Sequence, residues 1–201
     1  MEEGDLEDWK WRVDEILPPG PGAIDWDTLP DVERAIKDSE AMGGLDEVLV
    51  VNDKEIKGQA LELSGQTGFA IFPSRSILSL LCIHIKGMEK YMQIDIEIVD
   101  DAKKYRTFSI TNHRSVAVVE GDYAALPLQI GEGWQRLNID LDALTQLSFR
   151  SAYLTTCAVR VCSSCRVSRI FFQDRSYSDV ELPRHLRVLD ESQAIPTSAG
   201  G

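Results

Sequence analysis

Two pairs of side chains in this sequence have types and spacings that could do chemistry. Cys162 and Cys165 form a C-x2-C pair, the spacing of half a structural zinc site or of a redox-active dithiol. Asp95 and Glu97 alternate within "YMQIDIEIVDD", which would place two carboxylates about 7 Å apart on one strand face. Paired carboxylates can serve glycoside hydrolysis. Whether either pair can bind a metal or catalyse a reaction depends on the strands and turns that position it.

The cysteine pair lacks the rest of a metal or redox site. A structural zinc site needs four ligands, usually from two such pairs, and the sequence has no second pair. Cys157 and His185 could complete a set on paper, but nothing fixes them near the pair. A thioredoxin-like motif needs a strand followed by a helix, whereas "AVRVCSSCRVSRIFF" predicts strand, turn, strand. We interpret Cys162 and Cys165 as two turn cysteines with reduced thiols, or as one buried and one exposed cysteine.

The other candidate motifs are also incomplete. Asp95 and Glu97 lie on the polar face of an alternating strand, where acidic side chains are expected in any case. "GEGW" is not a dinucleotide-binding fingerprint, and "SGQTG" lacks the lysine of a phosphate-binding loop. The three histidines, His84, His113 and His185, are scattered. The sequence therefore predicts no catalytic residue, no metal site and no cofactor.

Charge is concentrated at one end of the chain. Residues 1–55 hold 17 acidic and 5 basic side chains, which accounts for the whole net charge of −12, whereas residues 56–201 hold 16 of each. This distribution argues against nucleic acid as a partner. The densest apolar stretch, "SILSLLCIHI", is about half of the roughly 20 residues that a membrane helix needs. The first residues lack the features of a signal peptide, so we expect an intracellular protein with no membrane partner.

Short strands dominate the sequence from Glu47 onward. "YMQIDIEIVDD" alternates with period two, and "YRTFSITN" follows after a Lys-Lys turn, which predicts a hairpin. Strand patterns recur about every 10–15 residues with turn signals between them, which indicates an all-β, antiparallel β-sandwich. "SRSILSLLCIHIKG" fits helix or strand equally well. "DLDALTQL" fits about two helical turns with Asp140 or Asp142 as the N-cap, so we predict one or two short helices.

The sequence before these strands is of a different kind. It contains "LPPGPG", which fits neither a helix nor a central strand, a helix-like stretch "TLPDVERAIKDSEAMGG", and three of the four tryptophans. We predict an acidic N-terminal extension over residues 1–45, a β-sandwich domain over residues 46–189 and a disordered tail over residues 190–201. The tryptophans leave two alternatives: the extension packs on its own domain, or it docks on a partner.

The fourth tryptophan, Trp134, follows a Gly-Glu-Gly turn and begins the stretch "WQRLNIDL". Its parity differs from that of Leu137 and Ile139, so its burial would require a bulge near Arg136. We expect Trp134 to be a core anchor between two sheets.

Arginine replaces lysine altogether between Arg150 and Leu189, where only three acidic residues oppose it. Such a cluster suits bidentate contacts with carboxylates, or it forms surface ion pairs. The stretch "RIFFQDRSYSDVELP" lies within it and predicts a buried strand that continues into a polar loop, pinned to the domain by Leu182 and Pro183. The arginines are Arg150, Arg160, Arg166, Arg169, Arg175, Arg184 and Arg187.

Three motifs in succession resemble one known family. "YMQIDIEIVDD", "GWQRLNIDLDALTQ" and "YLTTCAVRVCSSCRVSRIFFQDRSYSDVELP" resemble the family of cilia- and flagella-associated protein 20, over roughly residues 58–189. In that family a Val-Leu-Asp-Asp-like turn precedes a Gly-Trp strand, a short helix, a Cys-Arg pair and an Asp-Arg-x-Tyr-Ser-x-x-Glu-Leu-Pro segment. The matching positions are Val99, Asp100, Asp101, Gly133, Trp134, Asp140, Leu141, Leu144, Cys165, Arg166, Asp174, Arg175, Tyr177, Ser178, Glu181, Leu182 and Pro183.

The resemblance implies a jelly-roll-like β-sandwich without enzymatic activity. It implies a structural protein of the ciliary or flagellar axoneme and cytoskeleton, with the basal body as a further location. Such a protein would bridge tubulin protofilaments and neighbouring proteins at the inner junction of doublet microtubules. Two departures indicate a divergent member: the family begins with a basic, aromatic segment where this chain is acidic, and the family is basic overall. An acidic segment would favour a basic partner.

We therefore predict tubulin and other axonemal proteins as partners, because tubulin surfaces are acidic. The side chains that we expect to make these contacts are Arg166, Arg169, Arg175, Tyr177 and Arg184. The alternative function is a soluble adaptor or ligand-binding sandwich, similar in outline to carbohydrate-binding modules. That function needs coplanar exposed aromatic rings, for which the candidates are Tyr91, Tyr105 and Phe108, although their strand parity does not match.

Overall fold

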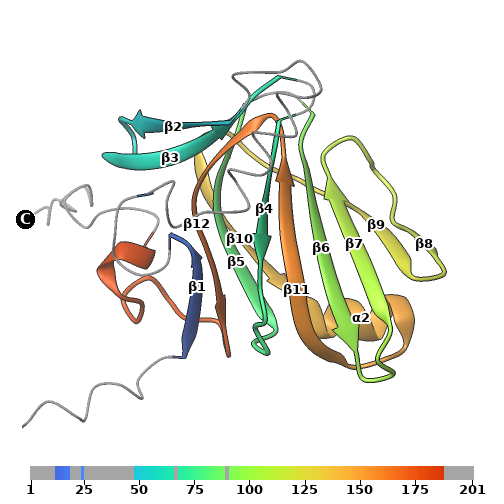
Figure 1. Ribbon diagram of the computed structural model, residues 1–201. Helices are drawn as coiled ribbons and strands as arrows, with labels where there is room; N and C mark the ends of the chain where they lie inside the picture. Colours follow the sequence, from blue (N-terminus) through green and yellow to red (C-terminus); the bar gives the residue numbers. More distant parts are fainter. Residues whose placement is uncertain (1–11, 19–23, 25–47, 66–67, 89–90, 188–201) are drawn as a thin grey trace, which may run out of the picture.

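Two six-stranded sheets pack face to face in the computed structural model, with a short helix at one end (Figure 1). The all-β sandwich that the strand pattern predicts is confirmed. No helix among the described residues is long and apolar enough to cross a membrane. The structure describes residues 12–18, 24, 48–65, 68–88 and 91–187.

The first sheet has the order β10-β5-β12-β3-β2, and β1 also pairs with β12. Strand β12 is central: one edge pairs with β5, while the other edge pairs with β3 at residues 165–167 and with β1 at residues 170–173. Strand β1 comes from the segment predicted to be an extension, so part of that segment completes the sheet. The strand bounds are β1 Val13–Leu17, β2 Val48–Asp53, β3 Gly58–Leu63, β5 Leu80–Gly87, β10 Trp134–Asp140 and β12 Cys165–Gln173.

The second sheet has the order β4-β11-β6-β7-β9-β8. The predicted hairpin is confirmed as β6 and β7, but β7 and β9 pair in parallel, a departure from the antiparallel pattern. The reason is the short hairpin of β8 and β9, which turns at Gly121 with φ +59° and returns the chain in the direction of β7. The strand bounds are β4 Phe69–Pro73, β6 Gln93–Asp100, β7 Tyr105–Thr111, β8 Val118–Glu120, β9 Tyr123–Pro127 and β11 Tyr153–Cys162.

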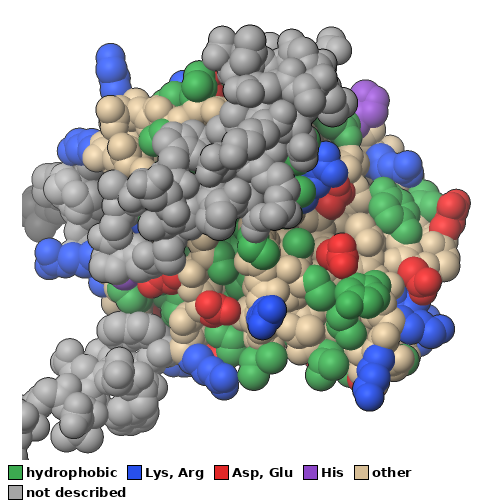
Figure 2. Space-filling model, viewed as in Figure 1, with side chains coloured by type: hydrophobic (Ala, Val, Ile, Leu, Met, Phe, Trp, Pro, Cys, Tyr) green, Lys and Arg blue, Asp and Glu red, His purple; other side chains and the backbone are tan. Residues whose placement is uncertain are grey.

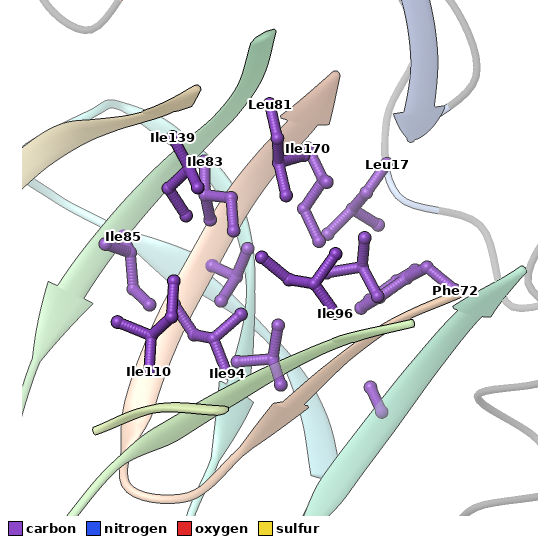
Figure 3. Close-up of a cluster of buried hydrophobic side chains, with 14 of the residues drawn as sticks. Leu17, Phe72, Leu81, Ile83, Ile85, Ile94, Ile96, Ile110, Ile139 and Ile170 are labelled. Atoms are coloured by element: carbon purple, nitrogen blue, oxygen red, sulfur yellow. The ribbon is translucent and has the colours of Figure 1, made fainter. Parts of the chain in front are cut away.

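The core lies between the two sheets and follows from strand alternation. Every second residue of β6 is fully buried, while Glu97 between them is exposed. The ambiguous stretch "SRSILSLLCIHIKG" is a strand in its second half, which forms β5 and contributes alternate residues to the same core. Figure 3 shows side chains from both sheets meeting in this layer, among them Leu81, Ile83, Ile85, Ile94, Ile96 and Ile170.

Helix α2 spans Leu141–Phe149 and begins as predicted, with Asp140 rather than Asp142 as its N-cap. The Asp140 carboxylate accepts a hydrogen bond from the Ala143 amide at 3.0 Å. The helix-like stretch in residues 28–44 lies outside the described residues.

The prediction for Trp134 was wrong. Strand β10 pairs with β5 without a register shift from Trp134 to Asp140, so there is no bulge near Arg136. Trp134 therefore shares the outer face of the sheet with Arg136 and is only partly buried, while Ile139 faces the core. Regular alternation along the strand decided its orientation, against the preference of a large ring for the interior.

Candidate functional site

The segment that follows β12, residues 174–187 and here named the C-terminal loop, packs on the outer face of the first sheet. It ends in the 3-10 helix η2, Arg184–Leu186. A second apolar cluster holds it there, separate from the main core and made of Cys82, Phe171, Tyr177, Leu182 and Leu186, with Val13 packed against it. The loop is therefore a fixed part of the domain surface.

Tyr177 anchors the loop from inside. Its side chain is 3% exposed, and its hydroxyl donates to Asp174 Oδ1 at 2.7 Å and accepts from the Arg12 amide at 3.2 Å. The Asp174 amide in turn donates to the Arg12 carbonyl at 3.3 Å. One phenol thus connects the loop to the residue that precedes β1.

Polar side-chain contacts connect the loop to neighbouring strands. Arg136 on β10 donates to Asp179 Oδ1 at 2.5 Å, and His185 Nε2 lies 2.9 Å from Glu15 Oε1 on β1. Arg187 reaches back and donates to the Leu182 carbonyl at 3.0 Å. No sequence signal indicated Arg136 or Glu15, because their partners are far away in the chain.

A tight turn shapes the tip of the loop. The amide and the hydroxyl of Ser178 both donate to Glu181 Oε2 at 2.8 Å, and the Glu181 amide donates back to the Ser178 carbonyl at 3.0 Å. The Glu181 carboxylate and the Ser178 carbonyl thus close one tight turn at the tip of the loop.

Two of the five predicted contact residues are exposed on this loop. The Arg175 guanidinium lies over the Tyr177 ring, 4.5 Å from its centroid, and 3.7 Å from Glu181 Oε1. Its side chain is 60% exposed. Arg184 is exposed at the start of η2, and its side chain has no hydrogen-bond or ion-pair partner among the described residues.

Arg166 binds partners inside its own chain. Its Nη1 lies 2.7 Å from Asp53 Oδ2, and its Nε donates to Glu62 Oε2 at 2.7 Å. Burial raises the pKa of Asp53, but the hydrogen bonds from Arg166 and from the Glu55 amide outweigh this effect and hold the pKa below its usual range. Arg166 thus joins β12 to β2 and β3.

The arginines of residues 150–187 do not form one surface. Arg169 lies on β12, half-buried, and burial lowers its pKa. Arg150 caps α2, and Arg160 stacks on the Phe69 ring of the second sheet, 4.2 Å from its centroid. Proximity in sequence did not predict proximity in space, because β11 and β12 belong to different sheets.

The C-x2-C pair occupies the connection between β11 and β12, as the strand-turn-strand prediction required. Burial raises the pKa of both Cys162 and Cys165, which makes the reactive thiolate the rare form. Within the described part of the chain, no three His, Cys, Asp or Glu side chains are grouped closely enough to hold a metal ion.

Asp100, in the motif "VDD", is the centre of a buried polar network. Its carboxylate accepts from Arg106 Nε at 2.8 Å, from Ser151 Oγ at 2.9 Å and from the Lys104 amide at 2.9 Å. Burial raises its pKa, but these donors prevail and lower it to about 2. The motif thus stabilises the turn between β6 and β7.

His84 lies beneath the C-terminal loop, between two arginines on the neighbouring strands. It pairs with Arg136 of β10 on one side and Arg169 of β12 on the other, and its ring meets Phe171 edge-on at 5.6 Å. Burial, and then these two guanidiniums, lower its pKa to about 3. The imidazole is therefore neutral.

The aromatic residues of the carbohydrate-binding alternative do not share a face. Phe108 is fully buried in the core, whereas Tyr91 and Tyr105 are exposed at different ends of the second sheet. An open cleft of about 1010 Å³ adjoins Tyr91 and the glycine-rich connection from β9 to β10. None of the five predicted contact residues lines it.

Comparison of this chain with known proteins identifies its family. A CFA20 domain matches residues 32–190. The chain belongs to the CFA20 family. It is 28% identical to cilia- and flagella-associated protein 20 of Chlamydomonas reinhardtii over 147 residues, which cover 69% of this chain and 77% of that protein. The protein of the same name from Paramecium tetraurelia is 29% identical with the same coverage.

These identities make the chain a divergent CFA20-family member, as the sequence motifs predicted. Among solved structures it is similar to the family 11 carbohydrate-binding module of the cellulase Lic26A-Cel5E of Clostridium thermocellum, with a TM-score of 0.33 and 14% identity. That likeness covers 62% of this chain and 79% of the module. A TM-score this low says nothing about ligands.

Proposed function

We propose that this CFA20-family chain is a non-enzymatic structural protein of the ciliary or flagellar axoneme. In this role it bridges tubulin protofilaments and neighbouring proteins at the inner junction of doublet microtubules. The observation that carries the proposal is the CFA20 domain match over residues 32–190, because the related proteins are named as cilia- and flagella-associated.

The C-terminal loop supports a docking role by its rigidity. Tyr177, Leu182 and Leu186 bury its apolar side, so little ordering entropy remains to be lost when a partner binds. Arg175 and Arg184 project from this fixed surface. Two exposed guanidiniums on a rigid loop suit an acidic partner such as tubulin, and they act through shape and charge rather than chemistry.

The proposal is tested in ciliated cells that express the tagged full chain. The tag should decorate the length of the axoneme and remain after detergent extraction. A variant with Arg175→Glu and Arg184→Glu should be lost on extraction, while the matched variant Arg150→Glu, on the far side of the domain, is retained. Diffuse signal from the unmodified chain in ciliated cells would overturn the proposal.

A further inference from the structure

The outer face of the second sheet carries a second surface that the family assignment does not explain. Two tyrosines stand on neighbouring strands: Tyr105 of β7 is 65% exposed and Tyr123 of β9 is 42% exposed. The side chains around them are small, among them Thr107, Ser109 and Ala125. Neighbours therefore leave both rings uncovered.

Strand register places carboxylates on both sides of these rings. Glu97 of β6 pairs with Thr107, Thr107 pairs with Tyr123, and Tyr123 pairs with Glu120 of β8. At about 4.8 Å between strands, the two glutamates lie about 14 Å apart with the tyrosine between them. The side chains of Glu97 and Glu120 are exposed and have no ion-pair or hydrogen-bond partner among the described residues.

The space-filling view agrees with this arrangement. Figure 2 shows hydrophobic and acidic side chains together over the region of β6, β7 and β9, with Lys and Arg side chains around its edge. Asp95, one register step along β6, adds a third carboxylate, and the one basic residue that the outward positions of β6, β7, β9 and β11 carry is Arg160. Arg160 is already stacked on Phe69.

We propose that this face, defined by Glu97, Tyr105, Glu120 and Tyr123, docks a basic, arginine- or lysine-bearing segment of another protein. A tyrosine ring attracts a cation placed over its face, and carboxylates on either side pair with cations before and after it along an extended segment. The exposed side chains of Arg175 and Arg184 give the C-terminal loop basic contact points, so the two faces favour partners of opposite charge. The inference is independent of the ciliary role and goes beyond it.

The test uses the full chain, labelled with nitrogen-15, and a synthetic ten-residue peptide of alternating arginine and glycine at about 150 mM salt. The amides of Thr107, Glu120 and Tyr123 should shift and saturate. The double variant Glu97→Gln with Glu120→Gln should weaken binding about five-fold, the combined size expected for two exposed ion pairs. Tyr123→Ser should weaken it by a similar factor.

Glu132→Gln is the matched control, because Glu132 is exposed in the connection between β9 and β10, away from this face. It should change the affinity less than two-fold. Equal weakening by Glu132→Gln would overturn the inference, because net charge alone would then explain binding. Shifts confined to residues 1–55 would overturn it also, since the acidic segment would then be the peptide's site.

Further titrations of the same labelled chain distinguish a basic segment from other ligands of this face. If the Tyr105 and Tyr123 amides shift with cellohexaose but not with the peptide, the face binds a glycan and not a basic segment. If they shift with rising protein concentration alone, the face binds a second copy of this chain. An alternating glutamate-glycine peptide should instead shift Arg175 and Arg184. Failure of that last arm would count against the acidic partner of the proposed function and leave the tyrosine face unaffected.

Discussion

Arg166 Nη1 lies 2.7 Å from Asp53 Oδ2, which joins the start of β12 to the end of β2 across 113 residues of chain. The Asp53 side chain is only 2% exposed, so its charge depends on this partner. Arg166→Met should lower the free energy of unfolding by about 2 kcal/mol, because it leaves a buried carboxylate unpaired. Urea denaturation measures the change.

A double-mutant cycle separates this pair from general packing. Asp53→Asn should lose less stability in the Arg166→Met background than in the unmodified chain. Additive losses would show that the two side chains do not depend on each other, and would return Arg166 to the list of side chains available to a partner.

The anchoring of the C-terminal loop predicts a graded loss of stability. Tyr177→Phe removes the hydrogen bonds to Asp174 and Arg12 and should cost about 1 kcal/mol. Leu182→Ala, at a 2% exposed position, should cost about 2–3 kcal/mol. Val180→Ala, in the same loop but 75% exposed, should remain within about 0.5 kcal/mol. Equal effects of all three would mean that the loop is not packed as a unit.

The sequence predicts features that depend on local patterns, but it does not predict contacts between residues far apart in the chain. The strict alternation of β6 identified its buried face, and Asp140 marked the start of α2, because both are local patterns. The partner of Arg166 could not be predicted, since strand order across the first sheet places Asp53 beside it. Tyr177 resembled a surface residue for the same reason: its burial depends on β1 and β5, far away in sequence.

Asp100 predicts a specific response to acid. Its pKa in the folded protein is about 2, below the ordinary value of 3.8, so its contribution to stability is complete above about pH 4. That contribution is lost as the pH falls through 4 towards 2, because over this range the unfolded chain binds a proton at this carboxylate more readily than the folded chain does. The stability difference between the unmodified chain and Asp100→Asn should therefore shrink over this range in urea titrations. A constant difference down to pH 2 would contradict the buried network.

His84 predicts a second pH dependence of folding stability, at higher pH, which arises from a buried neutral imidazole. Its folded-state pKa is about 3, whereas an unfolded histidine titrates near 6.5, so below pH 6.5 the unfolded chain binds the proton more tightly. Stability should fall by about 1 kcal/mol between pH 7 and pH 5.5 from this group alone. His84→Gln should remove that slope, and His113→Gln, at an exposed position, should retain it. The groups that face His84 are Arg136, Arg169 and Cys82, none of which changes charge in this window.

Charge reversal on the C-terminal loop tests the proposed partner directly. The Arg184 side chain has no hydrogen-bond or ion-pair partner among the described residues, so Arg184→Glu breaks no such bond there and should leave the unfolding free energy within about 0.5 kcal/mol. Co-sedimentation with polymerised tubulin should nevertheless fall about five-fold, because an attractive exposed pair becomes a repulsive one. Arg150→Glu makes the same charge change beyond the end of α2 and should bind normally. Equal loss in both variants would mean that tubulin responds to net charge, and the loop would then have no special part in docking.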